Sequence, residues 1–135
     1  MDNERILVVD DNPDNLELVR IVLECAGDDV RTAEDATQAM EALGSWHPDL
    51  ILIDIQLPGI DGLELTRRLR ANPAWRDISI VALTAYAMSR DEENARAAGC
   101  DGYITKPIDT RTFVSVVRGH LQQQRQGKYA AAPAM

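Results

Sequence analysis

The sequence lacks several features that would assign a protein to a common class. No apolar stretch is long enough to span a bilayer, and the polar residues 2–5 do not fit a secretory signal peptide. Basic residues are also few, because 14 lysines and arginines stand against 22 acidic residues, for a net charge of −8. Since phosphate contacts need a basic face, this balance disfavours direct binding of nucleic acid.

Cysteine is nearly absent as well. Cys25 and Cys100 form neither a disulfide framework nor a metal-ligand motif. We therefore expect reduced thiols and a cytoplasmic protein, since disulfides persist mainly in oxidising compartments. The 135 residues are enough for one domain with a real hydrophobic core.

What the sequence does contain is a regular alternation of short apolar runs and helical patterns. The apolar runs of strand length lie near residues 6–10, 29–33, 50–54, 80–84 and 102–105. The spacing of apolar residues between them predicts helices near 13–23, 36–43, 63–70, 89–99 and 113–121. Five such units predict an α/β fold, a doubly wound parallel sheet with helices on both faces. The run near residue 30 is the least apolar and is expected at an edge.

Polar residues stand at the carboxyl ends of four of these runs: Asp10, Asp11, Asp54, Thr84 and Lys106. If the runs are parallel strands, all five side chains meet at one edge of the sheet, where ligands bind in open α/β proteins. Three clustered carboxylates repel one another unless a cation is present. All-oxygen ligands suit Mg²⁺ or Mn²⁺ and do not suit zinc.

Asp54 is the best candidate for a reacting group. It ends the central apolar run, and the chain turns away from the sheet just after it. Mg²⁺ usually takes one or two carboxylates plus water and phosphate oxygens, which leaves a carboxylate free to attack phosphorus. Lys106 can neutralise the transferred group, and Thr84 can donate a hydrogen bond to it. Each residue alone is a common turn or cap, so the prediction depends on their combination.

These residues, with the segments 54–58 and 82–88, resemble the receiver domain of two-component response regulators, the family of the chemotaxis protein CheY. The resemblance covers residues 5–121 and is strongest to stand-alone, single-domain receivers of the DivK type. It implies a five-stranded flavodoxin-like sheet in the order 2-1-3-4-5 with five helices.

The resemblance implies a role for each matching residue. Asp54 accepts a phosphoryl group from a sensor histidine kinase or a histidine phosphotransfer protein. Asp10 and Asp11 bind Mg²⁺ together with the Asp54 carboxylate and the backbone carbonyl of Gln56. Lys106 pairs with a phosphoryl oxygen. The chain is then no turnover enzyme, since it catalyses only its own phosphorylation and slow dephosphorylation.

The resemblance also implies a switch. Thr84 hydrogen-bonds the phosphoryl group, and Tyr103 occupies the aromatic switch position. The face formed by the fourth helix, fifth strand and fifth helix then changes for a downstream protein partner. Residues 100–103 and 106–108 differ from the pattern of receivers attached to winged-helix DNA-binding domains, so the dimer interface of that subfamily is not expected.

A docking surface for the kinase or phosphotransfer protein is expected around the start of the first helix. The predicted contacts are Asn15, Leu16, Pro107 and Ile108. Periodicity alone leaves open whether Leu16 belongs to the core instead. We expect a receiver domain over residues 1–121 and a disordered, glutamine-rich tail over 122–135. The signal is expected to pass to a separate protein, without direct contact to nucleic acid or membrane.

Three rival interpretations explain less of the sequence. A phosphatase of the haloacid dehalogenase type needs a second aspartate two residues after its nucleophile, where this chain has Asn12 or Gln56. A flavodoxin-like nucleotide or flavin binder needs a phosphate-binding loop, but residues 11–14 are acidic and contain no glycine. A degenerate receiver that only binds proteins is disfavoured by the intact set of five site residues.

Overall fold

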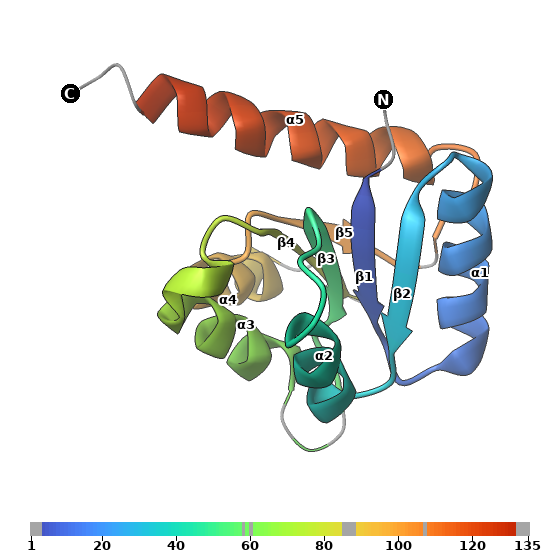
Figure 1. Cartoon of the computed structure of the whole chain (residues 1–135), viewed down its shortest axis with the longest axis horizontal. Helices are drawn as coiled ribbons and strands as arrows, with labels where there is room; N and C mark the ends of the chain where they lie inside the picture. Colours follow the sequence, from blue (N-terminus) through green and yellow to red (C-terminus); the bar gives the residue numbers. More distant parts are fainter. Residues whose placement is uncertain (1–3, 58, 60, 85–88, 107, 132–135) are drawn as a thin grey trace.

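The structure is a computed structural model and describes residues 4–57, 59, 61–84, 89–106 and 108–131, with the backbone alone at 89–91 and 123–131. A parallel sheet runs through the centre of the molecule, and helices lie on both of its faces (Figure 1). The α/β architecture predicted from the sequence is therefore confirmed.

The sheet has five strands in the order β2-β1-β3-β4-β5, and every neighbouring pair is parallel. Their bounds are β1 Arg5–Val9, β2 Asp29–Ala33, β3 Leu50–Asp54, β4 Ser79–Thr84 and β5 Gly102–Thr105. The strand order 2-1-3-4-5 is confirmed, and β2 lies at an edge as expected. All residues of β3 and β4 are buried, which explains why their sequences are almost continuously apolar.

The helices divide between the two faces of the sheet. Their bounds are α1 Pro13–Cys25, α2 Ala36–Leu43, α3 Gly62–Ala71, α4 Ser89–Ala98 and α5 Phe113–Ala131, with a short 3-10 turn η1 at Pro73–Trp75. Buried residues of α1 and α5 form one apolar cluster with the sheet, and buried residues of α2, α3 and α4 form another. Within the described residues, no helix is both long and apolar enough to cross a membrane.

Side-chain caps set where three helices begin. Asn12, Asp35 and Asp61 each accept a hydrogen bond from a backbone N–H in the first turn of the helix that follows, at 2.8–2.9 Å. Pro13 occupies the first position of α1, where its missing N–H costs nothing. Because each cap lies in a loop after a strand, the caps fix how the chain leaves the carboxyl edge of the sheet.

The predicted boundary at residue 121 differs from the structure. Helix α5 continues to Ala131 and projects beyond the body of the domain (Figure 1). Residues 122–131 therefore do not form the disordered tail expected from their composition. Their glutamine, arginine, lysine and alanine residues favour helix, and a helix already nucleated against the core extends at low cost. Residues 132–135 lie outside the described residues.

A buried ion pair anchors α5 to the start of β2. The Arg118 guanidinium donates to both carboxylate oxygens of Asp28, at 2.9 and 2.8 Å. The Asp28 side chain is fully buried, whereas the Arg118 side chain is 29% exposed. The backbone N–H of Glu4 also donates to Asp28, at 3.3 Å. A buried carboxylate with these partners is tolerated only while the guanidinium stays in place.

Removing the guanidinium should therefore destabilise the fold. We expect Arg118→Met to lower the free energy of unfolding by about 2 kcal/mol, since it strands the Asp28 carboxylate while solvent offsets part of the loss. The midpoint of urea unfolding at unchanged slope measures this. Arg111→Met is the matched control, because the Arg111–Asp109 pair at 3.4 Å is well exposed, and its midpoint should barely move. Equal midpoints for the two variants would contradict the anchoring role of Arg118.

Candidate functional site

The polar residues predicted at the strand ends do meet at one edge of the sheet. Asp10 follows β1 directly, Asp54 ends β3, Thr84 ends β4 and Lys106 follows β5. The backbone N–H of Lys106 donates to the carbonyl oxygen of Thr84 at 2.7 Å, which continues the β4–β5 ladder by one bond. Parallel strands in register thus bring side chains that are far apart in the sequence to a common point.

Lys106 bridges the two buried carboxylates of this edge. Its ammonium nitrogen lies 3.0 Å from Asp10 Oδ2 and 3.0 Å from Asp54 Oδ2. The side chains of Asp10, Asp54 and Lys106 are 1%, 10% and 19% exposed, respectively. Charge-assisted hydrogen bonds of this kind are strong where water is largely excluded.

The second oxygen of each carboxylate is held by the backbone. Asp10 Oδ1 accepts the N–H of Asn12 at 2.9 Å, and Asp54 Oδ1 accepts the N–H of Gln56 at 2.9 Å. Both are turns in which an aspartate caps the backbone two residues on. The amide of Asn15 lies 3.5 Å from Asp10 Oδ2, at the limit of a hydrogen bond. The two carboxylates are therefore fixed before any ligand arrives.

The environment moves the pKa values of the bridged groups. Burial raises the pKa of the Asp54 carboxyl above its ordinary 3.8, and the charge of Asp10 adds to this, although the Gln56 N–H and Lys106 oppose it. Burial alone would lower the pKa of Lys106, but its hydrogen bonds to Asp54 and Asp10 outweigh that effect and raise the pKa. Lys106 is therefore firmly protonated, whereas Asp54 resists carrying a charge.

Asp11 completes a set of donors that suits a hard cation. Ligand oxygens of Asp10, Asp11 and Asp54 lie within 4.8 Å of one another, and Asp11 is exposed while the other two are buried. Three carboxylates against one lysine leave an excess of negative charge that a divalent cation would offset, and oxygen-only donors suit Mg²⁺ or Mn²⁺. The residues present fit such an ion. A role for the Gln56 carbonyl stays a prediction.

Gly62 is a positioning residue that sequence reasoning missed. Its N–H donates to the carbonyl oxygen of Ile55 at 3.0 Å. A Cβ at this position would overlap the carbonyl oxygen of Asp54 and the side chain of Ile53. The start of α3 therefore packs directly on the end of β3. The signal in the sequence is a glycine just after the Asp61 cap, a pattern so common at helix starts that it does not single out a packing role.

The predicted switch residues share one face of the sheet. Tyr103 of β5 pairs in register with Ala82 of β4, and both pack in the layer under α2, α3 and α4. Thr84 is two residues after Ala82 on β4, so its side chain points to the same face of the sheet. Thr84 is buried, whereas Tyr103 is partly exposed. A hydrogen bond to the Glu92 carboxylate of α4 raises the pKa of Tyr103 above its ordinary value. The phenol thus faces α4 at its exposed rim.

The predicted docking residues differ in their exposure to solvent. Asn15 and Ile108 are partly exposed, so they can contact a partner. Leu16 is 7% exposed and packs in the core cluster under α1 and α5, so its prediction as a contact residue is wrong. Periodicity could not separate the two roles, since Leu16 lies on the inner stripe of α1. Pro107 lies outside the described residues.

Fold and site together define a doubly wound α/β protein with an acidic, lysine-bridged pocket at the carboxyl edge of its sheet. The family model described as the response regulator receiver domain matches residues 6–118. The chain therefore belongs to the response regulator receiver domain family, whose members act in two-component signalling with histidine kinases or phosphotransfer proteins and downstream targets.

Relatives of known type agree with this assignment. The polar-differentiation response regulator DivK from Brucella ovis is 39% identical over 116 residues, which span 86% of this chain and 94% of that protein. The receiver domain of a sensor histidine kinase from Pseudomonas aeruginosa is 33% identical, with a TM-score of 0.80 over 89% of this chain and 98% of that one. That structure has a magnesium ion coordinated in its active-site cleft. A CheY-like receiver domain protein from Methanospirillum hungatei is 28% identical, with a TM-score of 0.83 over 93% and 98%.

The raised pKa of Asp54 has a consequence for stability. Between pH 3.8 and the higher pKa of the folded state, the folded protein binds more protons than the unfolded chain, so stability falls as pH rises through this window. Asp54→Asn cannot ionise at this position, so it should not show this fall in stability with rising pH. With a chelator present, we expect the variant to be more stable than wild type at pH 7, on the order of 1 kcal/mol, and to lose this advantage as pH falls towards 3.8.

Urea unfolding at several pH values measures the difference. Asp11→Asn removes an exposed carboxylate from the same cluster and is the matched control, so it should show little advantage at any pH. A stability difference between Asp54→Asn and wild type that does not depend on pH would contradict the assigned cause.

Proposed function

We propose that the chain is a phosphoacceptor switch in which Asp54 receives a phosphoryl group from a phosphohistidine of a sensor kinase or a phosphotransfer protein. The observation that carries this proposal is the bridging of two buried carboxylates by Lys106, at 3.0 Å from each. A lysine that lies between a candidate nucleophile and a second carboxylate can move to pair with the negative charge of an incoming phosphoryl group. The proposed setting is the cytoplasm.

The transfer exchanges one bond to phosphorus for another. A carboxylate oxygen of Asp54 forms a bond to phosphorus while the bond from phosphorus to the histidine nitrogen breaks. The leaving nitrogen keeps the electron pair of that bond, and because the other ring nitrogen of the phosphohistidine is protonated, the donor is left as a neutral imidazole. Lys106, already protonated, pairs with a phosphoryl oxygen as its bond to Asp54 is given up.

A divalent cation fits beside this reaction. Asp10, Asp11 and Asp54 would hold Mg²⁺, with Mn²⁺ as a chemically equivalent alternative, and the Gln56 carbonyl is a further candidate ligand. The ion would supply positive charge to the phosphoryl oxygens. The buried Asp10 contributes chiefly through its hydrogen bonds to Lys106 and Asn12, whereas the exposed Asp11 offers the open side of the cluster.

The output is a change of surface rather than turnover of a substrate. The chain catalyses only its own phosphorylation and slow dephosphorylation, and a downstream protein responds to the face made by α4, β5 and α5. No direct contact with nucleic acid or membrane is required, which agrees with the net charge of −8. The alternatives are a receiver that binds proteins without phosphorylation and a phosphatase with an aspartate nucleophile.

Labelling with a small phosphodonor tests the proposal. Incubation with acetyl phosphate and Mg²⁺ should add one phosphoryl group to the intact protein, as read by mass spectrometry. Asp54→Asn should add none, and omission of Mg²⁺ should abolish labelling. Lys106→Met should slow it by about a hundredfold, the usual effect of removing one charge-stabilising group.

Each alternative gives a different result in the same experiment. An unphosphorylated binding module gains no mass, and a phosphatase releases inorganic phosphate continuously without a stable adduct. Asp14→Asn, which alters an exposed aspartate on α1, is the control that should label normally. Labelling that persists in Asp54→Asn would sink the assignment of the acceptor.

The switch is proposed to run from Thr84 to Tyr103. Phosphorylation adds roughly two negative charges beside Thr84, which can attract its hydroxyl. Tyr103 lies on the same face of the sheet as Thr84, beside Ala82 on the neighbouring strand. Its phenol is hydrogen-bonded to Glu92 of α4. Movement of Thr84 would open space into which Tyr103 can turn, at the cost of its bond to Glu92. The phosphoryl group biases this equilibrium only by its differential contact with the two states.

Separating acceptance from response tests this coupling. Thr84→Ala should still gain a phosphoryl group at Asp54 but lose most of the amide shifts that beryllofluoride induces in residues 89–106, as measured by NMR. Thr84→Ser keeps the hydroxyl and is the matched control, so it should retain the response. A full response in Thr84→Ala would rule out the coupling, since the hydroxyl would then be dispensable.

A further inference from the structure

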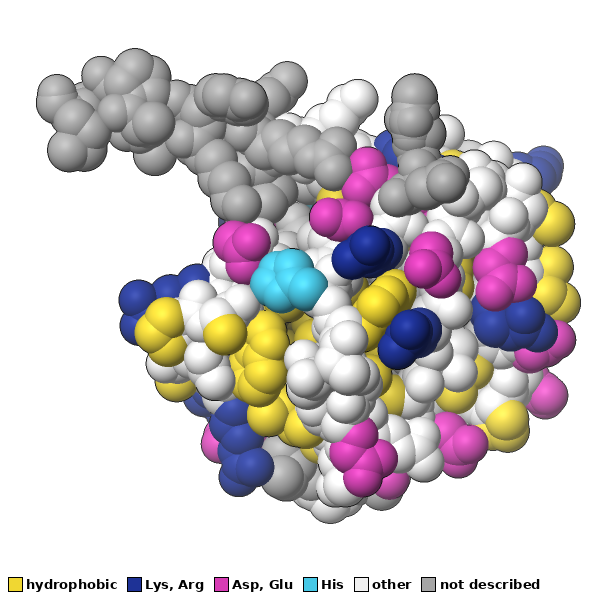
Figure 2. Space-filling model, viewed as in Figure 1, with side chains coloured by type: hydrophobic (Ala, Val, Ile, Leu, Met, Phe, Trp, Pro, Cys, Tyr) yellow, Lys and Arg dark blue, Asp and Glu magenta, His cyan; other side chains and the backbone are white. Residues whose placement is uncertain are grey.

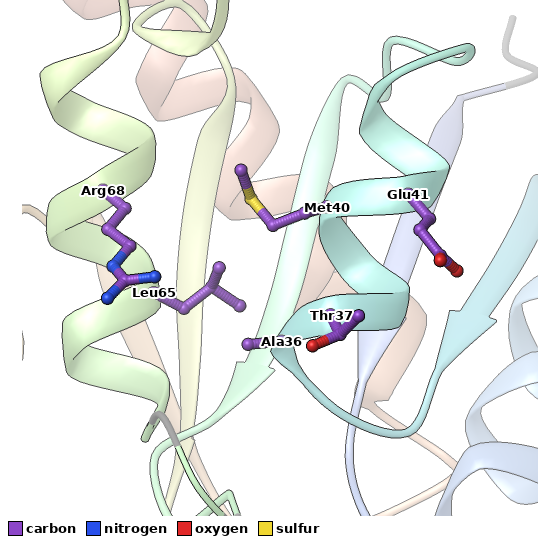
Figure 3. A pocket seen from close by; sticks show the side chains of 6 residues that line it. All are labelled: Ala36, Thr37, Met40, Glu41, Leu65 and Arg68. Carbon is purple, nitrogen blue, oxygen red and sulfur yellow. The ribbon is translucent and has the colours of Figure 1, made fainter.

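A groove lies between α2 and α3, on the face of the sheet that carries neither α1 nor α5. It has a volume of about 360 Å³ and is lined by Ala36, Thr37, Met40, Glu41, Leu65 and Arg68 (Figure 3). Hydrophobic side chains gather on the surface between these two helices in the space-filling view (Figure 2). Its volume falls within the range of binding pockets, and its floor is apolar.

The groove exists because the two helices pack on different parts of the fold. Helix α2 contacts β1 and β2, whereas α3 contacts η1 and α4. The inward face of α2 carries small residues, Ala36 and Ala39, which let it sit low on the sheet. Met40 and Leu65 then face the space between the helices from either side (Figure 3). Met40 is partly exposed and its unbranched thioether can adapt to an incoming apolar group.

The two walls carry opposite charge. Glu41 stands on the α2 wall and has no ion-pair partner among the described residues. Arg68 stands on the α3 wall, and among the described residues it forms one ion pair, a 3.4 Å contact with Glu64 in which both side chains are well exposed. An exposed pair of this length stabilises little, so Arg68 can exchange Glu64 for a partner's carboxylate.

We propose that this groove binds an amphipathic helix of a partner protein that places an aliphatic side chain between Met40 and Leu65, a basic residue against Glu41 and an acidic residue against Arg68. A partner helix suits this groove because its apolar side chains recur one turn apart along one face, with charged side chains on either flank that can meet Glu41 and Arg68. Apolar anchors at the same spacing would follow the groove.

The polar groups of the groove argue against a small polar molecule as occupant. Thr37, Glu41 and Arg68 are all exposed at the rim, and the floor of Ala36, Met40 and Leu65 has no polar atom to orient such a ligand. The groove also leaves α1 and the Asp10–Asp54–Lys106 pocket free. The proposal is therefore independent of phosphoryl transfer.

A designed peptide tests the proposal on the whole chain. The probe is a lactam-bridged helix of about 14 residues, roughly four turns, with two leucines one turn apart, lysine on one flank and glutamate on the other. We expect it to shift the amide NMR signals of residues 36–41 and 62–68 of the ¹⁵N-labelled protein. Glu41→Arg and Arg68→Glu should each weaken binding by about three- to fivefold, the effect of one exposed ion pair.

Charge exchange makes the test specific. The double variant Glu41→Arg/Arg68→Glu should bind the original peptide most weakly and recover affinity for a peptide with its lysine and glutamate flanks exchanged. Glu24→Arg/Arg111→Glu, which makes the same changes at exposed positions outside the groove, should bind like wild type. All four positions are exposed, so folding should be preserved, and circular dichroism checks this.

Three results would overturn the proposal. The first is the absence of peptide-induced shifts at the groove, and the second is equal affinity for both flank arrangements. The third is a shift of the groove signals that grows with protein concentration alone, because a second copy of the chain would then be the occupant.

Discussion

Two carboxylates, Asp10 and Asp54, can be buried side by side because the ammonium of Lys106 lies 3.0 Å from both. The rest of the site depends on this contact. Without the lysine, burial would force one of the aspartates to take up a proton or to turn towards solvent. The same contact ties together residues that follow β1, end β3 and follow β5, so the electrostatics of the pocket are set by the register of the sheet.

This dependence explains why the strands and the site cannot vary separately. Asp10, Asp54 and Lys106 meet only if β3 lies next to β1 and β5 lies next to β4, which is the order observed. The helices contribute at the same edge. Asn12, two residues after Asp10, caps the start of α1. Gly62 has no side chain, so the start of α3 can pack against the carbonyl of Asp54. A compact core and a competent pocket are thus two results of one topology.

Much of this could be predicted from the sequence, because β1, β3 and β4 are almost continuously apolar and four of the five strands end beside a chemically distinctive residue. Asp54, Thr84 and Lys106 could be placed at one edge of the sheet from the sequence alone.

The predictions that were wrong depended on packing. Leu16 has the same spacing whether it faces a partner or the core, and only the position of α1 on the sheet decides between them. The helical stretch 122–131 looked like a tail because its composition lacks the apolar stripe by which helices are recognised. The groove between α2 and α3 could not be foreseen at all, since it depends on how far apart two helices settle.

The two oxygens of Asp54 are not equivalent, and this bears on where a bond to phosphorus could form. Oδ1 is held by the N–H of Gln56 as part of the turn that leads the chain out of β3, whereas Oδ2 is held by the flexible side chain of Lys106. Substitution on Oδ1 would break the turn, but substitution on Oδ2 asks only that a lysine swing to a new oxygen. In the proposed phosphoryl transfer, the backbone of this chain would therefore direct the new bond to one of two chemically identical oxygens.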